Sequence, residues 1–214
     1  KGAYKSPQCL IPTPLDSAGK GDLVVEEFPV TFAGHTYPHS RIAYVKGRPA
    51  APVVLVHHNY AGLKQFDVDQ ACFLARAGYV GLAVDLYKEK DGYAYTDRNV
   101  TQDDGEERKH AHFRGAFDYM IELLRNPKHW RGLMAAYLEA AFAHPSVAKG
   151  MAGAIGYCLG GQSCFEQLRG GHQIQVIVSF HGLLHSRPTY KDEPYNSLRR
   201  ITVEEHHKEV DVPP

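Results

Sequence analysis

AIGYCLGGQS, at residues 154–163, places a cysteine between glycines where an apolar strand meets a helix. In a nucleophile elbow the reactive side chain lies on a sharp turn, so the residues two before and two after it must be very small. Gly156 and Gly160 meet this requirement. We therefore expect Cys158 at the carboxyl end of a central strand, where open α/β sheets bind their ligands.

Cys158 also has the surroundings of a nucleophile. A thiol at a helix N-terminus has its thiolate favoured by the helix dipole and by the amides of the first turn. The N–H of Leu159 follows directly and is the natural first donor to an oxyanion. The alternative is a small buried cysteine in a glycine-rich turn, but the strand and helix on either side favour the elbow.

Apolar runs and amphipathic segments alternate along the rest of the chain. The run at 53–56 is continuous, as expected of a strand buried on both faces. The same reasoning predicts further strands at 79–84, 151–155 and 174–180, and helices at 66–77, from an N-cap at Asp103 or Asp104 to Pro127, from Trp130 to His144, and from about Gly160. Residues 23–33 and 36–46 are typical of a hairpin that turns at Gly34-His35. This order predicts an α/β fold with a parallel sheet covered on both faces.

Composition narrows the class of partner. The 214 residues carry 24 Lys and Arg against 24 Asp and Glu, so the formal net charge is zero and no basic block is available for nucleic acid. The apolar runs are far too short for a membrane span. The four cysteines lack CxxC spacing, which favours reduced thiols and a reducing compartment. We expect a soluble protein of the cytoplasm, or of the soluble compartment of an organelle after processing.

Three segments resemble the dienelactone hydrolase family of α/β-hydrolases. GYCLGG at 156–161 is similar to the family's nucleophile motif, DLY at 85–87 to the end of its preceding strand, and residues 53–64 to its first oxyanion loop. The resemblance covers about residues 23 to 182. It implies a three-layer α/β sandwich with a mostly parallel sheet, Cys158 as the nucleophile, a lactone or small ester as the substrate, and no cofactor.

The first oxyanion loop departs from the family pattern. The family has a Glu here that contacts the resting thiol, whereas residues 56–62 contain no carboxylate and His58 or Asn59 occupies its place. His58 is a candidate to activate the thiol directly, or the loop supplies only N–H groups from Asn59 or Tyr60 to the oxyanion hole. A third interpretation is that His57 and His58 merely satisfy the strand end.

Arg108 is the candidate for substrate binding. The family can place a contact to the substrate carboxylate near this position, and an Arg there would bind a carboxylate in bidentate fashion. The alternative is an ordinary charged first turn of a helix, since the neighbouring residues are Glu106, Glu107 and Lys109.

The carboxyl-terminal part predicts an unfinished sheet. On this fold the catalytic acid and histidine follow strands beyond the elbow, but only one such strand is visible, at 174–180. We therefore predict an irregular arm at 1–22 and a hydrolase domain at 23–214 that lacks its last strands. A long apolar edge strand is usually paired or covered, so the alternative is a protein partner on the 174–180 edge.

The 13 histidines raise the question of a metal site. His110 and His112, and His181 and His185, have spacings that could chelate, but neither pair lies in an HExxH motif, so no metal is expected. His206 and His207 have the neighbours of a solvated helix face, which makes them weak substitutes for the triad histidine. The competing functional hypothesis is a non-catalytic hydrolase-like subunit of an assembly.

Overall fold

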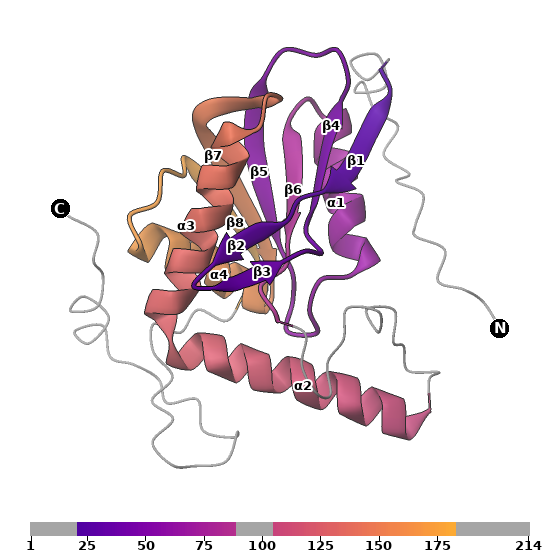
Figure 1. Cartoon of the computed structure of the whole chain (residues 1–214), viewed down its shortest axis with the longest axis vertical. Coiled ribbons are helices and arrows are strands. Elements are labelled where there is room, and N and C mark those ends of the chain that lie inside the picture. The colour runs from indigo at the N-terminus through magenta and orange to yellow at the C-terminus, as the bar shows by residue number, and fades with distance from the viewer. Residues whose placement is uncertain (1–20, 89–104, 183–214) are drawn as a thin grey trace.

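A six-stranded sheet forms the centre of the molecule, in a computed structural model that describes residues 21–88 and 105–182. Its strand order is β1-β4-β6-β5-β7-β8, with β5, β6, β7 and β8 parallel and β1 and β4 antiparallel to their neighbours (Figure 1). The strands are β1 (Leu23–Glu27), β4 (Arg41–Val45), β5 (Ala51–His57), β6 (Val80–Val84), β7 (Val147–Tyr157) and β8 (Val176–Phe180). The expected α/β class with a mostly parallel sheet is confirmed.

Helices cover both faces of this sheet (Figure 1). On one face α1 (Gln65–Arg76) packs through Val68 and Ala71 against the strand residues Val56 and Ala83. On the other face α3 (Pro127–Ala143) and α4 (Leu159–Arg169) share a core with Leu55. Successive strand residues point to opposite faces, so Leu55 and Val56 serve different cores. This arrangement is the predicted three-layer sandwich.

The helix α2 (Glu106–Arg125) lies across the end of the sheet where the parallel strands finish (Figure 1). The predicted N-cap at Asp103 or Asp104 is wrong, because Gly105 is the N-cap and the helix begins at the next residue. Pro127 is the first residue of α3, a position where its missing N–H costs no helical hydrogen bond. None of the helices within the described ranges is long and apolar enough to cross a membrane.

The predicted hairpin is divided between two sheets. Its inner part is β2 (Val30–Phe32) and β3 (His35–Tyr37), which pair with each other around Ala33 and Gly34, both of which have positive φ. Its outer part pairs β1 with β4 in the main sheet. Pro29 and Pro38 lie at the two breaks, where a proline cannot donate a ladder hydrogen bond.

The strand β8 forms one edge of the sheet that the structure describes. Val176, Val178 and Phe180 are exposed there, on alternate residues. A protein partner on this edge stays a prediction. Residues 183–214, which carry His185, His206 and His207, lie outside the described part of the chain, as do residues 1–20 of the predicted arm.

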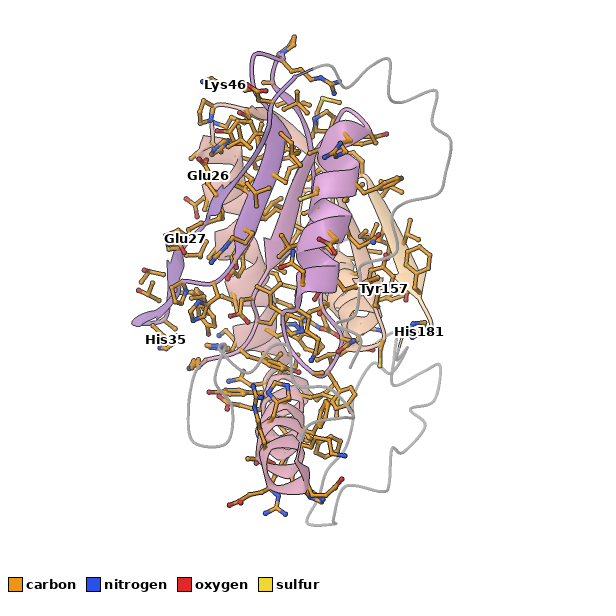
Figure 2. The ribbon with its side chains drawn as sticks, turned by 90° about the vertical axis from the view of Figure 1, so that its right-hand side faces the viewer. Glu26, Glu27, His35, Lys46, Tyr157 and His181 are labelled. Atoms are coloured by element: carbon orange, nitrogen blue, oxygen red, sulfur yellow. The ribbon has the colours of Figure 1, made fainter. Side chains whose placement is uncertain are left out.

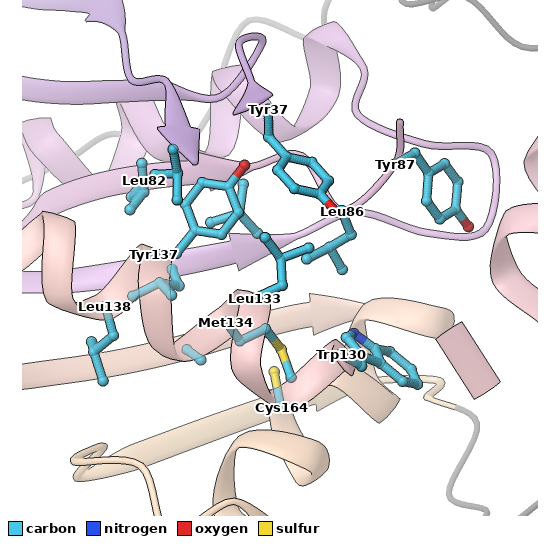
Figure 3. Packing of buried hydrophobic residues seen from close by; sticks show 14 of the residues in the cluster. Tyr37, Leu82, Leu86, Tyr87, Trp130, Leu133, Met134, Tyr137, Leu138 and Cys164 are labelled. Atoms are coloured by element: carbon cyan, nitrogen blue, oxygen red, sulfur yellow. The ribbon is translucent and has the colours of Figure 1, made fainter. Parts of the chain in front are cut away.

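A buried hydroxyl network joins the core helix to the sheet. The Ser40 hydroxyl donates to the Tyr137 oxygen at 2.7 Å, the Tyr137 hydroxyl donates to the Asp85 carbonyl at 2.8 Å, and the Asp85 N–H donates to the Ser40 oxygen at 2.8 Å. Figure 3 shows Tyr137 beside Leu82 and Leu133 in the apolar core. The closed ring of bonds satisfies polar groups that burial would otherwise penalise.

Replacing Tyr137 with Phe should lower the free energy of unfolding by about 1–3 kcal/mol, because the Ser40 hydroxyl and the Asp85 carbonyl lose a buried partner. Chemical denaturation of the full-length protein measures this change. Tyr79→Phe is the matched control, since Tyr79 is exposed and its substitution should change stability by less than about 0.5 kcal/mol. Equal changes in the two variants would contradict the assigned network.

Candidate active site

Cys158 lies on a strained turn between β7 and α4. Its backbone has φ 56° and ψ −110°, a region that residues with a side chain seldom adopt. The Cys158 N–H donates to the Phe180 carbonyl at 3.0 Å, and the Cys158 carbonyl accepts from the Gly161 N–H at 3.0 Å. Figure 2 places the neighbouring Tyr157 at the end of the sheet that faces α2. The predicted position of Cys158 at the carboxyl end of a central strand is confirmed.

Glycines allow this turn because the backbone approaches itself closely on both sides of the cysteine. A Cβ on Gly156 would lie 2.0 Å from the Gly160 carbonyl oxygen. A Cβ on Gly160 would lie 2.2 Å from the His57 carbonyl oxygen. No heavy atoms fit at such distances, so the two glycines set how closely α4 can approach β7 and β5.

The first turn of α4 presents the Leu159 amide. Leu159 is the first residue of the helix, where backbone N–H groups have no partner within the helix. Its side chain is buried in the core, which fixes the start of the helix. This amide is therefore suited to donate to negative charge that develops beside Cys158.

A tight loop after β5 contains the other predicted oxyanion donors. The Asn59 side-chain oxygen accepts from the Ala61 N–H at 2.8 Å, and the Asn59 carbonyl accepts from the Gly62 N–H at 3.1 Å. The Tyr60 carbonyl accepts from the Tyr87 hydroxyl at 2.9 Å. Tyr87 is buried, so this bond ties the loop to the segment that follows β6.

Tyr87 lies beside the candidate site and is not among the site residues predicted from the sequence. Its ring stacks on Tyr119 of α2 at 5.1 Å between centroids. Burial raises the pKa of Tyr87 well above its ordinary value, and the charges of Asp85 and Cys158 add to this effect. Tyr87 is therefore a neutral donor that lies in the electrostatic field of the candidate nucleophile. The DLY motif is the sequence signal for Tyr87, although the family resemblance relates that motif only to a strand end.

His58 is buried with both ring nitrogens engaged by the backbone. Its Nε2 accepts from the Leu86 N–H at 3.1 Å, so its Nδ1 carries the proton that is donated to the Asn59 carbonyl at 2.6 Å. Burial lowers the pKa of His58 to about 4, which keeps the ring neutral near pH 7. This geometry favours a positioning role for His58 over direct activation of the thiol.

His57 joins the strand end to the elbow helix. Its Nε2 forms a 2.8 Å hydrogen bond with the side-chain oxygen of Gln167 on α4, and burial lowers the pKa of His57 to about 4. His57 thus links the end of β5 to α4, while its buried Nδ1 has no hydrogen-bond partner within the described residues. The three interpretations of this histidine pair stay predictions.

An open pocket of about 460 Å³ lies between Tyr60 and one face of α2. The helix contributes aromatic and charged side chains to it: Glu106, Lys109, His110, Phe113, Arg114 and Phe117. Arg108 is exposed in the first turn of α2 and is not among these lining residues. Of the predicted site residues, Tyr60 lines this pocket, whereas Cys158, Leu159, His58, Asn59 and Arg108 are not among its lining residues.

The histidine pairs show no metal centre in the part of the chain described. No group of three or more His, Cys, Asp or Glu side chains that could hold a metal occurs within residues 21–88 and 105–182. His110 is exposed and pairs with Glu106, whereas His112 is buried in α2. His181 is exposed directly after β8, and His185 lies outside the described ranges.

The strand order and the elbow together define an α/β-hydrolase fold. Residues 41–203 match the model of the dienelactone hydrolase family. The chain therefore belongs to the dienelactone hydrolase family.

Individual proteins of known name or structure share about a quarter of their aligned residues with this chain. A probable 2-oxo-3-(5-oxofuran-2-ylidene)propanoate lactonase from Bradyrhizobium sp is 27% identical over 172 residues, which cover 78% of this chain and 61% of the relative. The solved structure named m3DLH is 26% identical, with a TM-score of 0.64 and coverage of 78% of this chain and 62% of that one. A dienelactone hydrolase-like promiscuous phosphotriesterase from metagenomic libraries is 25% identical, with a TM-score of 0.64 and coverage of 79% and 63%. The chain thus spans less than two thirds of the length of each relative.

Replacing Gly160 with Ala should destabilise the protein by about 1–3 kcal/mol or more, because the new methyl group would collide with the backbone of β5. Thermal and chemical unfolding of the full-length protein measure the loss. Gly105→Ala is the control, because a Cβ there would have no heavy atom within 4 Å. A Gly160→Ala variant as stable as this control would show that the close approach of helix and strand is not required.

Proposed function

We propose that this protein hydrolyses a lactone or small carboxylic ester by covalent catalysis at Cys158. The observation that carries the proposal is the strained backbone of Cys158 at the start of α4. Such a turn costs conformational energy and presents the side chain at the carboxyl end of the sheet, which is the arrangement of a nucleophile elbow. Membership of a hydrolase family and similarity to a protein named as a lactonase support the same reaction class.

The reaction proceeds in two steps. The Cys158 thiolate attacks the carbonyl carbon, and the carbonyl electrons move to its oxygen, where the N–H groups of Leu159 and Tyr60 receive the negative charge. The intermediate then expels the alkoxide, which is the ring oxygen in a lactone, and leaves a thioester on Cys158. Water then attacks the thioester carbonyl, the C–S bond breaks, the acyl group leaves as a carboxylic acid, and Cys158 is restored.

Proton transfer needs a further group. The departing alkoxide must gain a proton, and the attacking water must lose one. Within residues 21–88 and 105–182 no side-chain acid or base forms a hydrogen bond with the Cys158 sulfur, so we assign this task to a histidine outside the described ranges.

The pocket beside Tyr60 suggests the kind of substrate. Tyr60, Phe113 and Phe117 offer flat apolar surface, Lys109 pairs with Glu106 at 2.6 Å, and Arg114 adds positive charge. A planar unsaturated lactone that carries a carboxylate would suit both features. The name of the Bradyrhizobium relative describes a compound of this chemical kind. Arg108 stays the family-based prediction for the carboxylate contact.

Cys158→Ala should reduce hydrolysis of 4-nitrophenyl acetate by roughly 1,000-fold or more, because removal of a nucleophile eliminates the covalent route. Steady-state assays of the full-length protein measure the rate, and iodoacetamide labelling with peptide mapping measures thiol reactivity. Cys72→Ala is the matched control and should keep wild-type rates, since Cys72 is a half-buried residue of α1. If Cys158→Ala hydrolyses the ester normally, the proposal fails.

Arg114→Gln should raise KM for an anionic ester such as 4-nitrophenyl hemisuccinate by about 3- to 10-fold, and leave KM for 4-nitrophenyl acetate unchanged. The factor is modest because water screens charge pairs at an exposed pocket. Arg108→Gln in the same assay tests the predicted contact, and Arg76→Gln on α1 is the control. Equal KM changes for both esters in Arg114→Gln would exclude carboxylate binding at this residue.

A further inference from the structure

The peptide between Asn59 and Tyr60 is hydrogen-bonded through its carbonyl oxygen. Its carbonyl oxygen accepts two hydrogen bonds, from His58 Nδ1–H at 2.6 Å and from the Gly62 N–H at 3.1 Å. The peptide is trans, so its N–H, which belongs to Tyr60, points away from the carbonyl. Whatever fixes the Asn59 carbonyl therefore also fixes the direction of the Tyr60 N–H.

We infer that His58 is a positioning residue that locks the Asn59–Tyr60 peptide in the orientation an oxyanion hole requires. The inference rests on the proposed function, because it assigns the Tyr60 N–H as the second donor to the oxyanion formed at Cys158. A flipped peptide would turn the Asn59 carbonyl toward that oxygen and withdraw the donor. It would also leave the His58 and Gly62 donors without their acceptor, which burial penalises.

The imidazole is itself rigidly placed. It is fully buried, its Nε2 accepts from the Leu86 N–H, and its edge packs on the Tyr87 ring at 4.7 Å between centroids. Leu86 follows β6, the neighbour of β5 in the sheet, so the ring spans two strand ends. The Asp85 carboxylate is 3.9 Å from Nε2, beyond hydrogen-bond distance, and Leu86 can only donate, so Nε2 has no proton and the single proton of the neutral ring stays on Nδ1.

The strand end that leads into this peptide packs against the turn that carries the candidate nucleophile. The Gly160 backbone packs against the His57 carbonyl, and a Cβ on Gly160 would also lie 2.9 Å from the His58 carbonyl oxygen. The next carbonyl along the loop, that of Tyr60, is held by the Tyr87 hydroxyl. Two successive peptides of the loop are thus fixed by buried side chains, which is how a preorganised oxyanion hole avoids reorganisation during the reaction.

Two amide variants separate the two nitrogens of His58. The amide nitrogen of Asn can occupy the place of Nδ1 and donate to the Asn59 carbonyl, but it cannot reach Leu86. The amide of Gln reaches the place of Nε2, where its oxygen can accept from Leu86, and leaves the Asn59 carbonyl without the His58 donor. His58→Asn therefore keeps the proposed lock, and His58→Gln removes it.

The acylation burst with 4-nitrophenyl acetate is the test, measured by stopped flow on the full-length protein. We expect His58→Gln to acylate about 10- to 100-fold more slowly than wild type, as part of the roughly 100- to 1,000-fold that loss of one oxyanion donor costs. His58→Asn should stay within about 3-fold of wild type. Iodoacetamide should alkylate Cys158 at wild-type rates in both variants, because that reaction forms no oxyanion.

These measurements distinguish positioning of the Asn59–Tyr60 peptide by His58 from activation of the thiol by His58. Equal acylation rates in the two variants, or a slower rate in His58→Asn, would overturn the inference. Slower alkylation in both variants would assign His58 to thiol activation and overturn it as well. Loss of the burst in Cys158→Ala is the independent test of the proposed function, and a burst that survived in that variant would refute that function rather than the lock.

A measurement on the wild-type protein makes the test independent of whether the variants fold. Nitrogen-15 NMR of histidine-labelled protein reports which ring nitrogen carries the proton. Between pH 6 and pH 8 His58 should be neutral and protonated on Nδ1. An Nε2–H tautomer or an imidazolium signal for His58 would overturn the inference.

Discussion

The close approach of Gly160 to the His57 carbonyl is the contact on which the rest of the site depends. It joins the start of α4 to the end of β5, so the strained Cys158 and the loop at Asn59 and Tyr60 share one rigid boundary. A larger residue at Gly160 would separate the two amides that the proposed mechanism uses together. The distance between α4 and β5 is therefore limited by the backbone at Gly160, and this distance determines where the side chains of the site lie.

A series of buried hydrogen bonds connects the core helix α3 to the loop after β5. Tyr137 on α3 donates to the Asp85 carbonyl, the Asp85 carboxylate accepts from the Tyr87 N–H at 3.1 Å, and the Tyr87 hydroxyl donates to the Tyr60 carbonyl in the loop after β5. Each group is deeply buried, where a lost partner is costly. The DLY segment thus connects the core helix to the loop, which gives a chemical reason for an aspartate and a tyrosine at a strand end.

Local patterns predicted the elbow, the parallel strands and most helix boundaries, because glycine spacing and apolar periodicity are properties of neighbouring residues. The hairpin was predicted as one unit, and only the sheet pairing shows that Pro29 and Pro38 divide it. The partner of His58 Nε2 is an amide 28 residues away, so its engagement could not be predicted from the loop alone. Arg108 is off the pocket face because that face repeats every three to four residues from Glu106, and Arg108 is two residues along.

The proposed mechanism requires a covalent acyl intermediate on Cys158. Acid-quenched samples of the full-length protein, taken during turnover of 4-nitrophenyl acetate and analysed by peptide mass spectrometry, test it directly. We expect one acetyl group per protein, on the peptide that contains Cys158. Turnover without an adduct under conditions that preserve thioesters, or acetylation confined to another residue, would contradict it.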